Sequence, residues 1–228
     1  MTFTEVMQDI TSRQEQQDQL RRSLEEKSML VREIHHRVKN NLQMIVSLLS
    51  LQSSHTVDPR VVAAFEETES RVRAVAHIHE QLYASDDLSM VEIGSYLAAL
   101  ARELVAIHER TADGIQLHID VGELSLHIER AIPVGLIANE LILNSLKLGL
   151  RSGGNLRLSF TAAGPNPENT WAVLVIEDSG PGLPAGVDVC SQPQSMGYQL
   201  IHLLVRQLRA RLEIGPGPGA RITVSFPI

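Results

Sequence analysis

Two adjacent histidines stand out within residues 33–42, because an imidazole is largely neutral and nucleophilic at neutral pH. Val31 and Val38 recur at heptad spacing and predict a helix whose apolar seam they mark. In this phase His35 flanks the seam and His36 points away from it. His36 is therefore the candidate nucleophile, while two ordinary surface histidines without a role are the alternative that geometry leaves open.

A nucleophilic imidazole calls for a group that accepts its proton. Glu33 lies three residues before His36 and so on a neighbouring face of the helix, which makes it a candidate general base. An ordinary solvated glutamate is an equally open interpretation. His77 and His79 are two residues apart and project from different helix faces, so packing or hydrogen bonding is favoured over metal binding.

The second half of the chain places polar side chains where a ligand could use them. Glu140 and Asn144 are four residues apart on one face of an otherwise apolar helix. Asp178 follows an apolar strand and is followed by Gly180 and Gly182. Glycine lets the backbone approach a ligand closely, and a carboxylate can accept a hydrogen bond from an exocyclic amine.

A further feature lies at the start of a later helix. Gly197 is at its beginning, where unpaired N–H groups and the helix dipole suit a phosphate. Residues 183–194 before it are polar with Pro and Gly, as in loops that close over a ligand. Each of these signals is weak alone, because a single Gly-x-Gly is most often a turn.

The element that carries the histidines is a long helix. Residues 12–51 contain no Pro or Gly, and Asp58 and Pro59 then predict the start of a second helix that runs to about Ala84. The two helices are expected to form an antiparallel hairpin. Because two helices bury little, the hairpin is expected to pair with a second copy as a four-helix bundle, which predicts a homodimer.

After this hairpin the pattern changes to interleaved strands and helices. Ser89 and Glu92 have the spacing of a capping box that opens a third helix ending near Ile107. Strands are expected at 115–121, 156–161, 171–176 and 221–226, and helices at 133–150 and 198–209. The fold class is therefore α+β, a helical hairpin followed by a layered α/β sandwich with one sheet face covered.

Composition excludes several classes of function. The net charge of −7 without clustered Lys and Arg argues against binding to nucleic acid. Cys190 is the only cysteine, so neither an internal disulfide nor a cysteine metal site is expected, and a cytoplasmic location fits. No apolar run approaches the roughly 20 residues of a membrane span, so none is expected in this segment.

Residues 33–42 and the apolar stretch after them resemble the dimerisation and phosphoacceptor helix of histidine kinases of the HisKA_2 class, which are related to the HWE kinases. Residues 73–83 resemble the second helix of that class. The resemblance implies that His36 is the phosphoacceptor, with the basic residue Lys39 and with Leu42 at the usual distances after it.

The same resemblance implies that Asn40 is a candidate for orienting water in a phosphatase reaction. This chain departs from the larger sensor-kinase class at Arg37, where an acidic residue commonly follows the acceptor. The departure leaves the identity of the general base open.

The order of the motifs over residues 133–228 resembles the Bergerat (GHKL-type) ATP-binding fold of histidine kinases, gyrase-type ATPases and related chaperones. The resemblance implies that Asp178 binds the adenine amine and that Asn144 holds Mg²⁺. The other residues that it assigns to the ATP site are Asn139, Glu140, Lys147, Gly180, Gly182 and Gly197. Leu148 and Ala220 depart from the residues common in the family.

These resemblances imply a sensor histidine kinase of a two-component system, an enzyme that autophosphorylates His36 from ATP and passes the phosphoryl group to an aspartate of a response-regulator receiver domain. An ATP-incompetent phosphotransfer or scaffold protein is the alternative, and a gyrase-type ATPase is disfavoured by the hairpin. The residues do not indicate the signal, the cognate regulator or whether transfer is in cis or in trans.

The start of the chain suggests a preceding sensor. Residues 2–11 resemble the last strand and the Asp-Ile-Thr exit of a PAS or LOV domain. We therefore expect three parts: residues 1–28 as a signalling helix at the end of a sensor domain, 29–88 as the dimerisation and phosphotransfer hairpin, and 89–228 as the catalytic ATP-binding domain.

Overall fold

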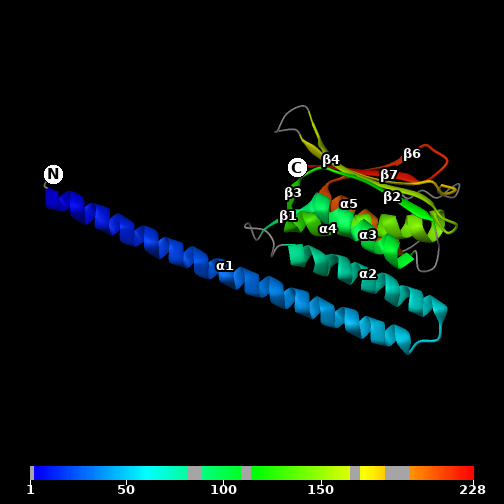
Figure 1. The fold of residues 1–228 in the computed structure, drawn as a ribbon, viewed down its shortest axis with the longest axis horizontal. Helices are drawn as coiled ribbons and strands as arrows, with labels where there is room; N and C mark the ends of the chain where they lie inside the picture. The colour runs from blue at the N-terminus through cyan, green and yellow to red at the C-terminus, as the bar shows by residue number, and fades with distance from the viewer. Residues whose placement is uncertain (1–2, 82–88, 109–113, 165–169, 183–195) are drawn as a thin grey trace.

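The structure is a computed structural model that describes residues 3–81, 89–108, 114–164, 170–182 and 196–228. Its elements stack in four layers: a β-sheet, a layer of helices beneath it, the helix α2, and the long helix α1 outermost (Figure 1). The amino-terminal part of α1 projects well beyond the rest of the molecule. The helix α2 therefore separates α1 from the α/β half.

The first two helices form the predicted antiparallel hairpin. Helix α1 spans Phe3–Ser54 and helix α2 spans Pro59–Gln81. Asp58 caps α2 as expected, since its Oδ1 accepts a hydrogen bond of 2.9 Å from the backbone N–H of Arg60. The predicted end of the second helix, near Ala84, lies outside the described residues.

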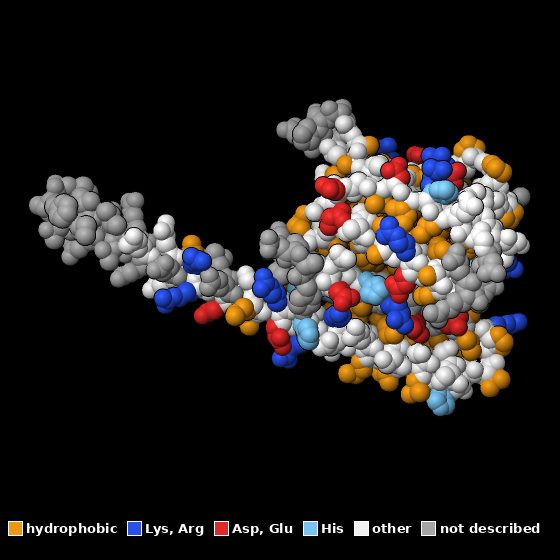
Figure 2. Space-filling model, in the orientation of Figure 1, with side chains coloured by type: hydrophobic (Ala, Val, Ile, Leu, Met, Phe, Trp, Pro, Cys, Tyr) orange, Lys and Arg blue, Asp and Glu red, His pale blue; other side chains and the backbone are white. Residues whose placement is uncertain are grey.

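The face of α1 that packs on α2 agrees only in part with the predicted seam. Val38 of the seam is half-buried there together with Leu42, Val46 and Leu49, whereas Val31 and Ile45, seven residues before and after Val38, are 37% and 43% exposed. The apolar residues of the long helix thus divide into a stripe that α2 covers and a stripe that it does not cover, and heptad counting merged the two. The other stripe remains on the surface of this chain, and Figure 2 shows hydrophobic side chains along the lower edge of the hairpin.

The beginning of the chain is helical from Phe3 rather than a strand followed by an exit turn. A strand needs a neighbouring strand for its backbone hydrogen bonds, whereas a helix closes its own. With no adjacent strand among the described residues, this segment continues α1, which also passes residue 28 without a break. The three-part division of the chain stays a prediction.

In the α/β half the described residues form seven strands, three helices and one π-turn. In chain order these are β1 Met90–Glu92, α3 Ile93–His108, β2 Ile115–Val121, β3 Ser125–His127, α4 Ile128–Asn144, the π-turn η1 Ser145–Gly149, β4 Gly154–Ala163, β5 Trp171–Asp178, α5 Met196–Leu208, β6 Arg211–Gly215 and β7 Arg221–Pro227. The main sheet has the order β2-β4-β5-β7-β6, in which only β2 and β4 are parallel. The α+β class is confirmed.

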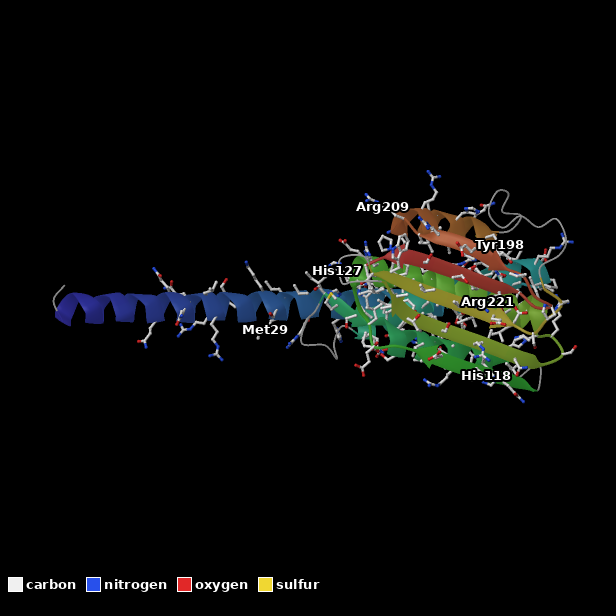
Figure 3. All side chains as sticks on the ribbon, turned by 90° about the horizontal axis from the view of Figure 1, so that it is seen from above. Met29, His118, His127, Tyr198, Arg209 and Arg221 are labelled. Carbon is white, nitrogen blue, oxygen red and sulfur yellow. The ribbon has the colours of Figure 1, made fainter. Side chains whose placement is uncertain are left out.

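One face of the sheet is covered by α3, α4 and α5, and the other is polar. Residues of β4 alternate, with Leu156, Leu158 and Phe160 buried toward the helices. The open face carries charges such as Arg221, which is 3.7 Å from Glu177. Figure 3 shows Arg221 and His118 on this open face. The core therefore lies between the sheet and the three helices.

The predicted capping box is wrong in detail. Residues 90–92 form strand β1, which pairs with β3, and α3 begins at Ile93. Glu92 itself caps the helix, because its carboxylate accepts hydrogen bonds of 3.1 and 2.7 Å from the N–H groups of Gly94 and Ser95. The available partner strand β3 decides the local conformation of residues 90–92.

Helix α4 and its π-turn together are long and apolar enough to cross a bilayer by length and composition alone. In the fold, 67% of that window is buried inside the chain. The segment Ile128–Gly149 is thus accounted for as the core helix of the α/β half.

Candidate functional site

The carboxylate of Asp178, at the end of β5, is held in a cradle of hydrogen bonds. Its Oδ2 accepts a bond of 2.7 Å from the hydroxyl of Ser145, and its Oδ1 accepts from the N–H groups of Gly180 at 2.9 Å and Ala220 at 3.3 Å. Asp178 is 5% exposed. A buried carboxylate that is fixed in this way presents its acceptor positions in one orientation.

The π-turn after α4 brings the backbone up to this carboxylate. A Cβ atom on Gly149 would lie 2.7 Å from Oδ1 of Asp178, and one on Gly180 would lie 2.5 Å from the Cα of Gly149. Only glycine permits these two approaches. A regular helix through residue 150, as the sequence predicted, would carry the chain past Asp178, and single π-turns of this kind are frequent at functional sites.

Two further residues lie near the Asp178 carboxylate: Gly182, which was predicted, and Tyr198, which was not. Gly182 adopts a φ of +80°, which requires glycine and turns the chain after Asp178. Tyr198 on α5 is near enough that burial, followed by the charge of Asp178, raises the pKa of its phenol. The phenol therefore stays neutral beside Asp178. The predicted loop 183–194 lies outside the described residues.

Asn144, the last residue of α4, has a side chain that the protein leaves unsatisfied. Its buried Nδ2 has no hydrogen-bond partner among the described residues. A buried polar group without a partner costs roughly 1–3 kcal/mol, so such a group points to a ligand that completes it. The amide oxygen of Asn144 is a suitable hard donor for Mg²⁺.

Asn139 and Glu140, the other predicted site residues on α4, contact the hairpin instead. Both oxygens of the Glu140 carboxylate accept hydrogen bonds from Arg71 on α2, at 2.8 Å from Nε and 2.9 Å from Nη2. The hydroxyl of Ser70 donates to Oδ1 of Asn139 at 2.9 Å. The hydrogen bonds to Glu140 raise the pKa of Arg71, so its guanidinium remains charged.

Lys147 and Gly197 complete this contact zone. Nζ of Lys147 donates to Oε1 of Glu67 on α2 at 2.9 Å. A Cβ atom on Gly197 would lie 2.6 Å from Oε2 of Glu140, so this glycine lets the start of α5 press against the carboxylate. The beginning of α5 and the polar face of α4 are therefore adjacent, as a phosphate site between them requires.

On the hairpin, His35 and His36 have different surroundings. Nδ1 of His35 is 3.1 Å from Nδ1 of His79, so the two rings share a hydrogen bond between α1 and α2. Burial, and after it the charge of His35, lowers the pKa of His79. His36 is exposed, as predicted.

The imidazole of His36 contacts Asn40, and the predicted general base Glu33 is paired with Arg37. The side-chain amide of Asn40 is 3.2 Å from Nδ1 of His36, one helical turn away. Glu33 instead accepts a hydrogen bond of 2.8 Å from Nε of Arg37. Arg37, which stands where sensor kinases commonly have an acidic residue, is thus hydrogen-bonded to Glu33, the candidate general base.

The structure separates the predicted site residues into three groups. Asp178, Gly180 and Gly182 cluster at the carboxylate cradle, with Asn144 on the adjoining helix. Asn139, Glu140, Lys147 and Gly197 lie where α2 docks. His36 and Asn40 lie on α1, and Glu33 is paired with Arg37.

Sequence reasoning missed Ser145, Gly149, Ser70, Arg71 and Glu67. Ser145 and Gly149 follow the Asn144 motif directly, so a polar residue and a glycine at a helix end were the available signals. The three α2 residues carry no such signal, because polar residues on a helix are ordinarily solvated.

Comparisons with known proteins agree on one family. Residues 33–108 match the HisKA_2 model, described as a histidine kinase family. The chain is 28% identical over 203 residues to a blue-light-activated histidine kinase 2 of Erythrobacter litoralis, covering 86% of this chain and 56% of that protein. It is also 28% identical over 193 residues to the sensor histidine kinase PdtaS of Mycobacterium tuberculosis, covering 81% and 36%.

A solved structure has the same arrangement of a hairpin and an α/β half. The histidine kinase domain of a blue-light-activated kinase from Erythrobacter litoralis superposes with a TM-score of 0.65 at 25% identity, covering 86% of this chain and 90% of that domain. The chain spans about half the length of one curated relative and about a third of the other.

Proposed function

We propose that the chain is the kinase core of a two-component sensor, because residues 33–108 match the HisKA_2 histidine kinase model and the similar proteins are histidine kinases. In this proposal the chain autophosphorylates His36 from ATP and passes the phosphoryl group to a receiver aspartate. The observation that carries this proposal is the pairing of an exposed imidazole at His36 with the built carboxylate cradle at Asp178 in one chain. The intact cradle weighs against an ATP-incompetent scaffold.

The nucleotide site is proposed at the junction of α4, β5 and α5. Asp178 accepts a hydrogen bond from the exocyclic amine of adenine through a carboxylate that Ser145 and two backbone N–H groups hold in place. The amide oxygen of Asn144 is assigned to Mg²⁺ as a hard donor, and its buried Nδ2, which has no partner among the described residues, can donate a hydrogen bond to a phosphate oxygen. When bound, Mg²⁺ supplies positive charge that offsets the charge of the transferring phosphoryl group.

The remaining predicted residues shape the same site. Gly180 and Gly182 shape the adenine pocket, and Gly197 places the amino-terminal N–H groups of α5 at the phosphates. Asn139, Glu140 and Lys147 border the phosphate side. Ala220 replaces the more common threonine without loss of its backbone N–H, which still donates to Asp178.

The chemistry at His36 follows from its contact with Asn40. An amide can present either its oxygen or its NH₂ group, which have the same shape, to Nδ1. With the oxygen facing Nδ1, this nitrogen keeps the ring proton and Nε2 carries the lone pair. Nε2 then bonds to the γ-phosphorus as the bond from that phosphorus to the bridging oxygen breaks, ADP leaves, and the proton on Nδ1 passes to solvent.

A homodimer is part of the proposal, because α1 retains an apolar stripe that no described residue of this chain covers. The exposed large hydrophobic residues on it are Met29, Leu30, Ile34, Met44, Ile45, Leu48 and Leu51. They recur with helical spacing along the hairpin and face away from α2, so a second copy of the hairpin can bury them as a four-helix bundle. Figure 3 shows Met29 on the projecting part of α1.

The relatives are longer than this chain, and two of them are named as blue-light-activated kinases. We therefore propose that a sensor domain of PAS or LOV type feeds α1 from its amino-terminal side, in a cytoplasmic protein whose output is a response regulator. The projecting, uninterrupted α1 suits transmission of a rotation or register shift into the hairpin.

Incubation of the purified chain with γ-labelled ATP and Mg²⁺ tests the proposal. Acid-labile label is expected on the wild type and on His35→Gln, and it should be lost in His36→Gln and Asn144→Ala. His35→Gln is the matched control, because it alters the neighbouring histidine that packs between the helices. Label that survives His36→Gln would reject the acceptor, and a folded chain that binds no Mg²⁺-ATP would reject the enzyme.

A further inference from the structure

The contact between His35 of α1 and His79 of α2 has no part in the proposed phosphoryl transfer. Nδ1 of His35 lies 3.1 Å from Nδ1 of His79, and the ring centres are 5.3 Å apart with the ring planes tilted by 45°. Both residues are half-buried, so the pair lies at the edge of the hairpin interface and within reach of solvent. The two nitrogens that face each other are therefore both available as ligands for an ion.

The spacing of these nitrogens matches two imidazole ligands on one metal ion. Imidazole nitrogen binds Zn²⁺ and similar ions at about 2.0–2.1 Å, so ligand–metal–ligand angles of about 90° to 110° place two nitrogens roughly 2.9–3.4 Å apart. The observed 3.1 Å falls within this range. With each ring centre about 1.2 Å behind its nitrogen, the same angles place the centres roughly 4.5–5.3 Å apart, and the observed 5.3 Å lies at the upper end. An ion can thus enter with small rotations of the rings and no movement of either helix.

Two opposite charges border the pair and offset each other. Lys39, one turn after His35, forms an ion pair with Glu80, which follows His79. Among the residues that the structure describes, no three His, Cys, Asp or Glu side chains gather that could hold an ion. The pair therefore supplies two ligands and water supplies the others, which makes an exchangeable site rather than a closed structural one.

We propose that His35 and His79 form a site for a divalent late transition-metal ion, such as Zn²⁺ or Cu²⁺, which ties α1 to α2 beside the proposed phosphoacceptor. The ion takes both Nδ1 lone pairs, and the proton that the two rings share moves to Nε2 through solvent. Neutral imidazole suits these ions, whereas Mg²⁺ prefers oxygen ligands. The site therefore differs in chemistry from the Mg²⁺ site proposed at Asn144, and it needs no nucleotide, so it does not rest on the proposed function.

A bound ion changes the mechanics of the hairpin. Two coordination bonds replace one hydrogen bond between α1 and α2, so the helices resist rotation or separation at the level of His35. The ion binds the folded hairpin, in which the two nitrogens are already close, and therefore stabilises it as its concentration rises. His36 remains exposed and in contact with Asn40, so the ion does not occupy the proposed nucleophile.

Calorimetric titration of the chelator-treated chain with Zn²⁺, in the absence of nucleotide, tests the site. The variants are His35→Gln and His79→Gln, because glutamine keeps a hydrogen-bonding side chain but is a poor ligand for these ions. His77→Gln is the matched control, since His77 lies two residues before His79 and pairs with Glu103 of α3 instead. Thermal unfolding of each variant in the presence of chelator shows that it is folded before Zn²⁺ is added.

His35→Gln and His79→Gln should each weaken Zn²⁺ binding by about tenfold or more, because loss of a ligand costs at least as much as loss of a group that orients one. His77→Gln should bind like the wild type, and Zn²⁺ should raise the melting temperature of these two proteins alone. With Cu²⁺, electron paramagnetic resonance should show coupling to two nitrogens in the wild type and to at most one in His35→Gln and His79→Gln. Unchanged affinity in those two variants, loss of affinity in His36→Gln or His77→Gln instead, or no binding by the wild type overturns the site.

Discussion

A substitution at Gly135 can separate α2 from the α/β half without altering the ion pair between Arg71 and Glu140. It lies on α4 where α2 and α3 meet, and a Cβ atom there would be 2.8 Å from Cδ1 of Ile78 and 2.9 Å from both Cε1 and Oη of Tyr96. Tyr96 cannot swing aside while α2 is docked, because its hydroxyl is bonded to Ala74. The variant Gly135→Ala therefore wedges α2 away from α4.

The loss of docking free energy in Gly135→Ala is set by the inserted methyl group alone, because the second effect of the substitution cancels. Inserting a methyl group into a packed core costs about 1–3 kcal/mol. Alanine also favours a helix interior over glycine by about 1 kcal/mol, but α4 is helical whether α2 is docked or released, so this gain cancels in the docking equilibrium. Docking should thus weaken about 5- to 150-fold, at tenfold per 1.4 kcal/mol.

Hydrogen exchange is the assay, because it resolves α2 from the sheet in one sample. Amides of α2 should exchange faster by the factor above, while those of β4 and β5 should change by less than about threefold. Gly122→Ala is the control, since its Cβ would have only an ordinary contact of 3.8 Å with the carbonyl of Phe160. Unchanged α2 protection in a folded Gly135→Ala protein would refute the packing argument.

Three further predictions test other parts of the molecule. Asp178→Asn should lower Mg²⁺-ATP affinity at least tenfold in calorimetry with the fold retained, because an NH₂ group would face the adenine amine; unchanged affinity would remove Asp178 from the adenine site. The lowered pKa of His79 means that the unfolded chain takes up its proton first, so urea midpoints should be flat above about pH 6.5 and fall below it. His79→Gln should flatten this fall, and an equal fall in the variant would contradict the assignment. Ile45→Glu with Leu48→Glu should halve the mass measured by light scattering, whereas a wild type that is already monomeric would contradict the homodimer.

Much of the α/β half could be predicted because its signals are local. Alternation in residues 115–121 and 221–226 reports which side chains face the helices, and both stretches are strands with nearly those limits. Asp178 was predictable for the same reason, since a carboxylate followed by two glycines at a strand end is read within a few residues.

Features set by distant partners were not predictable in this way. The long helix carries two apolar stripes, and only the position of α2 decides that Leu42 and Val46 face inward while Ile45 stays exposed. Likewise, the π-turn at Ser145 depends on a carboxylate 33 residues further along the chain. The spacing of apolar residues shows which of them share a helix face. It does not show which face a distant element covers, because that element lies elsewhere in the sequence.

Arg71 and Arg73 show how far sequence reasoning reaches on this chain. Both are arginines on one helix with a glutamate four residues before, and nothing local distinguishes them. The side chain of Arg73 is 44% exposed beside Glu69, a type of pair that contributes about 0–1 kcal/mol. Arg71 is withdrawn from water against Glu140, where loss of one partner costs about 3–5 kcal/mol. The two residues thus differ in consequence only through a contact made 69 positions away, and that contact joins the helical hairpin to the α/β half.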